Sequence, residues 1–535
     1  MKTVGATAGG TLDQTTTGSS FPHTPRRRSS PLDLGLLALV ACVGALLRFH
    51  ALAAKCFWFD EGVSVAIARL DWYNFARILW RREANMSLYY LLLRFWLHLG
   101  GSEFFVRSLS VLFAIASIPA IYLLGRRLFD ARVGLIAAAL LAINAYHVQY
   151  SQEARAYSLM VLLCLLSSLY FIQSLTEPSR RNRVAYVLTS ALAVYAQFFS
   201  ALLVITQWVS LRFLDRGDSA TQAPAKTRND WRWIVLLTLP VLVFVVTTGT
   251  GPLRWVQRPG WQDLWAFALH LTGNGGPLLL LTFTAACFAT LLPALRGREA
   301  RRVPWESWRY RFLLLWWLLP ILLTLGLALA KPLFVPRYFI FCLPPLLLLV
   351  SSGITRLRPA WIMVPAVLLL FALSTRGTID YYEQDLDIQR DDWRSATRYL
   401  LENAKPGDAG LFHVPMGRMP YEFYISLLKP ESAAPDVLYP YHGDRLTFLD
   451  FVEKPDDALI ERSLPKHPRA WLVLTYAETH SGLPDARSVE LSQILGTSYS
   501  AVEKREFAGI EILLYARKSA GDASDASPPP NRSSY

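Results

Sequence analysis

Three short stretches of the sequence place ionisable side chains beside aromatic residues, at the ends of long apolar runs. They are residues 58–61 (WFDE), 150–157 (YSQEARAY) and 331–338 (KPLFVPRY). A carboxylate in such a place can accept a proton from a hydroxyl nucleophile, and an arginine can stabilise phosphate charge. Charged groups beside a membrane are costly unless they are paired or used. Each stretch alone is equally consistent with an ordinary membrane anchor, but three of them together favour a functional site.

The composition indicates what kind of protein holds these stretches. Of the 535 residues, 53% are hydrophobic and 18% are charged, whereas soluble proteins have about 25% charged residues. The mean hydropathy is +0.27. These values exclude an intrinsically disordered chain and a simple soluble enzyme. The net charge of +13 comes largely from cations in short loops between apolar runs, which is typical of membrane topology and not of nucleic-acid binding.

Apolar runs long enough to cross a membrane recur along the first two thirds of the chain. The predicted spans are residues 33–53, 104–124, 132–148, 156–175, 184–198, 199–213, 233–250, 276–294, 312–330, 336–353 and 360–375. Arginines concentrate in alternate loops, which predicts a cytoplasmic N-terminus. All three stretches then lie on the outer face, together with the region after residue 377.

Two regions outside the spans have their own predicted structure. In the first outer loop, residues 55–102, we expect short helices over 61–70 and 74–84 and a surface-lying helix over 87–100. After residue 377, a helix over 391–403 and strands over 409–414, 470–476 and 510–516 predict a small α/β domain. The predicted fold class is therefore an α-helical polytopic membrane protein with about eleven transmembrane helices and a small C-terminal α/β domain. The expected divisions are a disordered cytoplasmic tail (1–32), a transmembrane domain (33–376), an extracytoplasmic domain (377–518) and a disordered tail (519–535).

The order of several motifs carries a family resemblance. WFDEG is followed by LYYLLLRFWLHLGGSEFFVRSLS, GRRLF, YSQEARAYSL and PRYFIFCLPPLLLL. This order, over most of residues 33–375, resembles the GT-C superfamily of multi-pass glycosyltransferases, specifically glycosyltransferase family 39. That group includes protein O-mannosyltransferases and the aminoarabinose transferases that modify lipid A. The resemblance implies a bacterial-type plasma membrane protein that transfers a sugar from a polyprenyl-phosphate donor to a glycolipid, glycan or protein acceptor.

The resemblance also implies roles for particular residues. The family's acidic residue in the first outer loop falls on Asp60, with Glu61 beside it, and its second acidic residue falls on Glu153. These three are the expected catalytic residues, with Asp60 as the general base. The family's basic residue near the late span falls on Arg337, the first expected ligand of the donor phosphate. Because the leaving group is a lipid phosphate, Arg155, Arg81 and Lys55 are weaker candidates for the same role. Tyr157, Tyr338 and Trp58 are candidate sugar or acceptor contacts, and the two tyrosines are also consistent with interfacial anchors. No cofactor is required, although the three acidic residues are also compatible with a divalent metal.

The chain departs from the family pattern at two places. Asn85-Met86-Ser87-Leu88 stands where the family often has His-Pro-Pro-Leu, and Gln197 stands where a histidine is common. The main alternative from another class is a transporter or flippase of a lipid-linked substrate. Such a protein would place ionisable groups near the membrane midplane and often contain an inverted repeat. Neither feature is clear in this sequence, which favours the enzyme.

Overall fold

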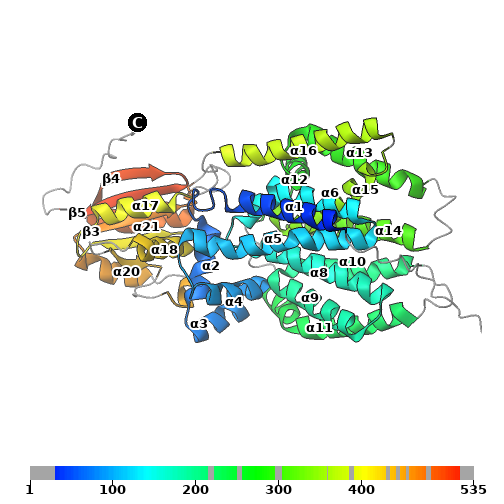
Figure 1. The fold of residues 1–535 in the computed structure, drawn as a ribbon. Coiled ribbons are helices and arrows are strands. Elements are labelled where there is room, and N and C mark those ends of the chain that lie inside the picture. Colours follow the sequence, from blue (N-terminus) through cyan, green and yellow to red (C-terminus); the bar gives the residue numbers. More distant parts are fainter. Residues whose placement is uncertain are drawn as a thin grey trace, which may run out of the picture.

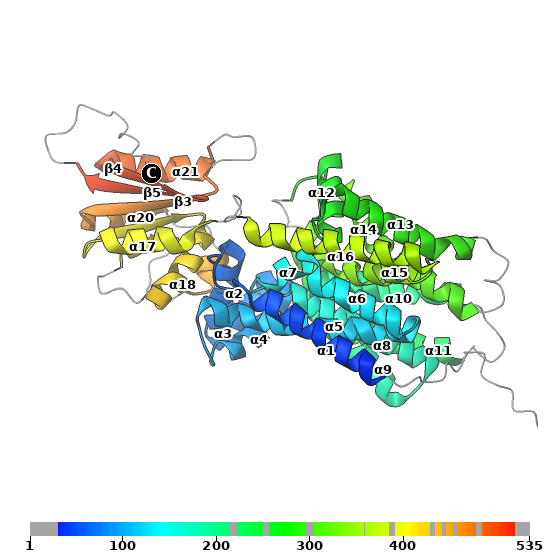
Figure 2. The same cartoon turned by 45° about the horizontal axis from the view of Figure 1, so that its top comes forward.

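The computed structural model describes residues 30–214, 222–249, 256–295, 304–357, 359–384, 391–428, 434–440, 446–452, 457–477 and 484–518. The predicted terminal tails therefore lie almost entirely outside the described residues. The chain forms a long helical bundle and a separate sheet domain, and the helices α2–α4 lie between them (Figures 1 and 2). The protein is thus a multi-pass membrane protein with a small C-terminal domain.

Seven segments of the described chain are long and apolar enough to cross a membrane. They lie in α1 (Pro31–Phe49), α5 (Glu103–Leu128), α8 (Tyr157–Thr176), α11 (Gln222–Thr248), α14 (Pro304–Ala328), η6 (Pro336–Cys342) with α15 (Leu343–Ile354), and α16 (Ala360–Glu383). Two further pairs of helices would each make a bent span. These are α6 (Ala131–Ile143) with α7 (Ala145–Ser151), bent by 59°, and α12 (Trp261–Thr272) with α13 (Gly276–Leu295), bent by 73°.

The structure thus has up to nine candidate spans in the described residues, whereas the sequence predicts eleven. The difference lies in residues 184–213. This region forms α9 (Arg180–Ala196) of 17 residues, followed by a shorter apolar stretch, Phe198–Phe213, that contains α10 (Ala201–Ser210). Gln197 joins them in an extended conformation. All eleven predicted segments are therefore helical. At 17 residues α9 is at the lower limit for a span, and the stretch after it is shorter still.

The first outer loop folds into short helices. They are α2 (Phe59–Arg69), α3 (Trp72–Ile78), η1 (Leu79–Glu83), η2 (Ala84–Met86) and α4 (Ser87–Trp96). With 10 residues, α4 is about 15 Å long and cannot cross a bilayer. Its buried residues, Tyr89, Tyr90 and Leu93, share one face of the helix. This arrangement agrees with a short helix beside the membrane.

The C-terminal domain is a five-stranded sheet with helices. Its strands are β1 (Ala409–His413), β2 (Asp436–Tyr439), β3 (Arg469–Thr475), β4 (Tyr499–Phe507) and β5 (Ile510–Arg517), in the order β2-β1-β3-β5-β4. β1 is parallel to both β2 and β3, whereas β5 is antiparallel to β3 and β4. The helices include α17 (Trp393–Asn403), α18 (Arg418–Leu428), α19 (Leu449–Val452), α20 (Asp457–Ser463) and α21 (Ala486–Ser498). The predicted helix and the three predicted strands are all present.

The domain is attached to the loop that carries the WFDEG motif. Arg394 of α17 forms an ion pair with Glu103 at 2.6 Å and donates to the carbonyl of Ala53 at 2.9 Å. Phe57 stacks on Phe423 of α18 with 4.4 Å between ring centroids. Because these contacts combine charge pairing with ring stacking, the domain holds the start of α2 directly.

Candidate functional site

Asp60 and Glu61 stand in the first turn of α2, where the partial positive charge of the helix N-terminus favours acidic residues. Ser64 donates to the carbonyl of Asp60 at 2.8 Å, which continues the first turn. Residues Glu61 to Ala68 are buried. Gly62 is required here because a Cβ at this position would lie 2.8 Å from the backbone of Pro420 in α18. The helix is therefore fixed in position on both sides.

Glu61 is completely engaged in a buried ion pair. Arg107 of α5 donates from Nε to Oε1 at 2.8 Å and from Nη2 to Oε2 at 2.6 Å. The backbone N–H of Ala154 donates to Oε1 at 2.8 Å. Arg107 also donates to the carbonyls of Leu52, Lys55 and Cys56. The pair therefore ties together α2, α5, the turn before α2 and the loop between α7 and α8.

Asp60 has a different environment. Its Oδ2 lies 3.5 Å from Arg155 Nη2 and 3.5 Å from Arg337 Nη2, and it has no hydrogen-bond partner among the described residues. The side chain is 21% exposed. One carboxylate therefore faces two guanidinium groups at a distance longer than a direct hydrogen bond. The structure thus brings together one residue from each of the three sequence stretches.

Arg155 lies where α7 ends and α8 has not yet begun. Its Nη1 donates to Ser64 Oγ at 3.2 Å and is 3.5 Å from the Tyr90 hydroxyl. Tyr90 in turn donates to Glu83 at 3.1 Å. Burial raises the pKa of the Glu83 carboxyl. Glu83 and Tyr90 therefore support Arg155 from the side of η1 and α4.

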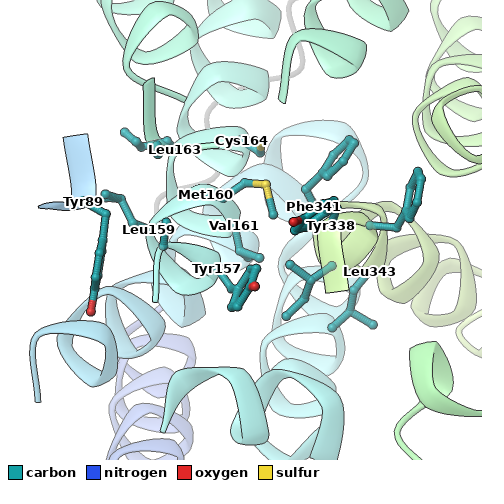
Figure 3. Packing of buried hydrophobic residues seen from close by; sticks show 14 of the residues in the cluster. Tyr89, Tyr157, Leu159, Met160, Val161, Leu163, Cys164, Tyr338, Phe341 and Leu343 are labelled. Carbon is teal, nitrogen blue, oxygen red and sulfur yellow. The ribbon is translucent and has the colours of Figure 1, made fainter. Parts of the chain in front are cut away.

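Arg337 is placed by the packing of η6 against α8. Tyr146 of α7 donates to the carbonyl of Pro336 at 2.8 Å. Figure 3 shows the buried side chains of α8, including Tyr157, Met160 and Val161, next to Tyr338 and Phe341 of η6. The guanidinium of Arg337 lies 5.5 Å from the ring centre of Trp58 and 5.8 Å from that of Tyr338. Two of the predicted aromatic residues, Trp58 and Tyr338, therefore lie within cation–π distance of the arginine.

The other predicted site residues lie elsewhere. Glu153 is 2% exposed and its backbone carbonyl accepts a hydrogen bond from the Arg155 N–H at 2.8 Å, whereas the Arg155 side chain pairs with Asp60. Arg81 is exposed on η1. Lys55 stands over the ring of Tyr381 at 4.4 Å and lines a polar cavity of about 320 Å³. The lining of this cavity includes neither Asp60 nor Arg337.

The carboxylates of Asp60 and Glu61 are surrounded by guanidinium groups, which disfavours a divalent metal at this pair. Both oxygens of Glu61 bind Arg107, and Asp60 Oδ2 faces two cations. No group of three acidic, histidine or cysteine side chains within the described ranges is arranged to hold a metal ion. Hard cations need several anionic or neutral oxygen ligands, and Asp60 and Glu61 offer few that are not already opposite a guanidinium group.

Comparison with known proteins adds to this geometry. Residues 87–248, which make up less than half of the chain, match the sequence model of a family described as dolichyl-phosphate-mannose-protein mannosyltransferase. A sequence search of the curated proteins gave no match.

Solved structures resemble almost the whole chain. The crystal structure of ArnT from Cupriavidus metallidurans bound to undecaprenyl phosphate has a TM-score of 0.62 and 15% identity, covering 92% of this chain and 99% of that chain. The crystal structure of the same protein in the apo state has a TM-score of 0.61 and 12% identity, and the match covers 90% of this chain and 98% of that chain. The archaeal oligosaccharyltransferase AglB from Archaeoglobus fulgidus, in complex with an inhibitory peptide and a dolichol-phosphate, gives 0.50 and 10%, covering 92% of this chain and 75% of that chain. The chain has the fold of the GT-C glycosyltransferases, and the resemblance seen in its motifs is confirmed.

Proposed function

We propose that this GT-C protein transfers a glycosyl group from a polyprenyl-phosphate-linked sugar to an acceptor hydroxyl, with Asp60 as general base. One observation carries the proposal. The Asp60 carboxylate lies between Arg155 and Arg337, at 3.5 Å from each guanidinium. A proton acceptor beside two phosphate-binding groups is what this reaction needs. The family match and the fold support the same class of donor.

The reaction can be written with these residues alone. The acceptor oxygen attacks C1 of the sugar while Asp60 takes the proton from that oxygen. The bond between C1 and the phosphate oxygen breaks, and its electron pair leaves with the polyprenyl phosphate. Negative charge grows on that phosphate in the transition state, where Arg337 and Arg155 stabilise it. Direct displacement inverts the configuration at C1.

Glu61 has a positioning role in this proposal. Its two oxygens already accept hydrogen bonds from Arg107 and from the Ala154 N–H, so neither is available to a substrate in the described arrangement. Through Ala154 it holds the loop that presents Arg155. This differs from the catalytic role expected from its place beside Asp60.

The membrane side of the reaction is part of the same proposal. The arginine-rich loops of the sequence support a cytoplasmic N-terminus in a bacterial-type plasma membrane, with the site and the C-terminal domain facing outward. The acceptor is then an envelope glycolipid, glycan or protein. The sugar is a hexose, a pentose or an amino sugar.

The test measures transfer in liposomes that contain the purified protein and an envelope extract as acceptor. Undecaprenyl phosphate carrying a labelled hexose, pentose or amino sugar is supplied in separate reactions. The wild type should move label from one donor to the extract, and mass spectrometry should find a product heavier by one sugar. Asp60→Asn should lower turnover by about 10²–10⁴-fold, the usual contribution of general acid–base catalysis.

The matched control is Asp436→Asn, which changes an aspartate that is 59% exposed on β2. It should retain wild-type turnover. Full transfer by Asp60→Asn would contradict the role of Asp60. Movement of the lipid across the bilayer by the wild type, with no transfer to any acceptor, would instead favour the flippase.

A further inference from the structure

The C-terminal domain places an aspartate directly over the start of α2. Asp391 precedes α17, and the Cys56 thiol donates to its backbone carbonyl at 3.4 Å. The next residue, Asp392, donates from its N–H to the carbonyl of Ala508 at 2.8 Å. Asp391 is therefore fixed between the turn before α2 and the hairpin that joins β4 to β5.

The hairpin is shaped to leave room for this side chain. Gly509 has a positive φ of 70°, which glycine adopts without a steric penalty. A Cβ at this position would overlap Asp391 Oδ1 and lie 3.2 Å from its Cα. Gly509 is thus required both by its backbone conformation and by the close approach of Asp391.

The Asp391 carboxyl is buried but incompletely bonded. It is 4% exposed, and Oδ2 has no hydrogen-bond partner in the part of the chain that the structure describes. Burial raises the pKa of Asp391 to about 7, against the Trp393 side chain, whose N–H lowers it, and the negative charge of Asp60 adds to the rise. Cys56, whose thiol donates to the Asp391 carbonyl, stands four residues before Asp60 in the chain. Native proteins rarely leave a buried polar atom without a partner, so Oδ2 of Asp391 requires an explanation.

Tyr476 reaches the same region from the end of β3. Its φ of 51° is unusual for a bulky residue, and such strain often accompanies a functional role. The side chain is 53% exposed, and its ring lies 6.0 Å from that of Phe59 in α2. Burial and then the charges of Asp391 and Asp60 raise the pKa of its hydroxyl, and Arg337 opposes them.

We propose that the C-terminal domain completes the sugar-binding site, with Asp391 and Tyr476 forming hydrogen bonds to hydroxyl groups of the glycosyl unit that is held between Asp60 and Arg337. The proposal rests on the function proposed above and adds a second domain to its site. It accounts for the unpartnered oxygen of Asp391, for the strained backbone of Tyr476 and for the attachment of the domain to the loop before α2.

Sugar hydroxyls suit these two groups better than the lipid phosphate does. A carboxyl and a phenol can each donate or accept a hydrogen bond. A carboxylate would repel the phosphate, which has Arg155 and Arg337 beside it. The structure therefore divides the donor between the two parts of the molecule, with the phosphate against the bundle and the sugar against the sheet domain.

The test compares two lipids that differ only in the sugar. Undecaprenyl phosphate and undecaprenyl phosphate carrying a hexose, a pentose or an amino sugar are titrated into the full-length protein in detergent. Tryptophan fluorescence reports the binding affinity. The wild type should prefer at least one sugar-bearing lipid to undecaprenyl phosphate by about tenfold, which corresponds to about 1.4 kcal/mol. Asp391→Ala should remove most of this preference, and Tyr476→Phe should remove part of it.

Three controls separate the possible outcomes. Asp391→Asn should restore the preference because an amide retains hydrogen-bonding capacity, and Asp436→Asn should behave like the wild type. Binding of undecaprenyl phosphate itself should be unchanged in every one of these variants, which also verifies that they are folded. The proposal is overturned if the wild type shows no preference for a sugar, or if Asp391→Ala and Tyr476→Phe both retain it. It is also overturned if these variants lose affinity for undecaprenyl phosphate and for the sugar-bearing lipid to the same extent. The residues would then stabilise the fold and would not contact the sugar. Failure of the wild type to bind undecaprenyl phosphate would instead contradict the proposed function.

Discussion

Two neighbouring acidic residues of α2 have opposite surroundings. Glu61 is enclosed by the N–H groups of Arg107 and Ala154, with distances of 2.6–2.8 Å. Asp60 faces Arg155 and Arg337 at 3.5 Å, with Oδ2 left without a hydrogen bond within the described chain. A carboxylate whose oxygens already accept all their hydrogen bonds stabilises the fold, whereas one with an unused acceptor can still bind a substrate. The contrast shows that position in the motif alone does not determine role.

The largest expected effect is a loss of protein stability when the ion pair between Glu61 and Arg107 is broken. Glu61→Ala leaves the Arg107 guanidinium buried without its carboxylate, and breaking a buried pair in this way costs about 3–5 kcal/mol. We expect a lower melting temperature and a lower yield of folded protein in detergent. Asp60→Asn should lower the melting temperature less, because its carboxylate is 21% exposed and lies 3.5 Å from each arginine. Equal melting temperatures for Glu61→Ala and the wild type would show that the pair does not stabilise the fold.

Sequence reasoning identified the open cluster but not the enclosed one. Asp60, Arg155 and Arg337 each stand at the end of an apolar run, and this placement marks them as costly and therefore informative. Arg107 was visible as a charge within the FFVRSLS stretch, but nothing in the sequence pairs it with Glu61. Asp391 and Tyr476 belong to a different domain, and their contacts with Cys56 and Phe59 depend on how that domain docks.

The fold shows the same division between local and long-range information. The apolar runs predicted all eleven helical segments, and in up to nine of them the length reflects the thickness of a bilayer. Two strands of the C-terminal domain, β2 and β4, have no comparable hydrophobic pattern and were not predicted. β2 has only four residues, and β4 is an edge strand with the charged sequence YSAVEKREF. Edge strands often carry charges that prevent further pairing, so their hydrophobic pattern is weak.

A third carboxyl group extends the comparison to pH. Burial raises the pKa of Asp391 to about 7, whereas in the unfolded chain it ionises near 3.9. The folded state therefore keeps a proton that the unfolded state has lost. The corresponding stability is fully present below the unfolded pKa and is lost as the pH rises towards 7, by up to about 1.4 kcal/mol for each pH unit.

Asp391→Asn removes this titration and so provides the measurement. The titratable or charged groups around Asp391 include Asp60 on α2, Cys56 before α2, Tyr476 after β3, Asp392 before α17 and Arg394 in α17. They remain in the variant. We expect the melting temperature of the wild type, relative to that of Asp391→Asn, to fall between pH 5 and pH 7. Parallel pH curves would show that Asp391 is already ionised in the folded protein.

The open cluster predicts a smaller, binding-specific effect at Arg337. Arg337→Ala should weaken the binding of undecaprenyl phosphate by about 10–100-fold, because hydrogen bonds to charged groups contribute about 1.5–3 kcal/mol. Arg337→Lys should be intermediate, since it keeps the charge but not the planar fork. Titration by tryptophan fluorescence measures both variants. Unchanged affinity in Arg337→Ala would remove this arginine from the phosphate site.

The smallest expected effect is at Arg81, the one predicted phosphate ligand that is exposed on η1. Substitution of an exposed side chain away from caps, cores and charge networks usually changes stability by less than about 0.5 kcal/mol. Arg81→Ala should therefore melt like the wild type and bind undecaprenyl phosphate with unchanged affinity. It is the matched control for Arg337→Ala, because both variants remove one arginine. A tenfold loss of affinity in Arg81→Ala would mean that the phosphate site extends to η1. The phosphate would then be bound by Arg81 as well as by the arginines beside Asp60.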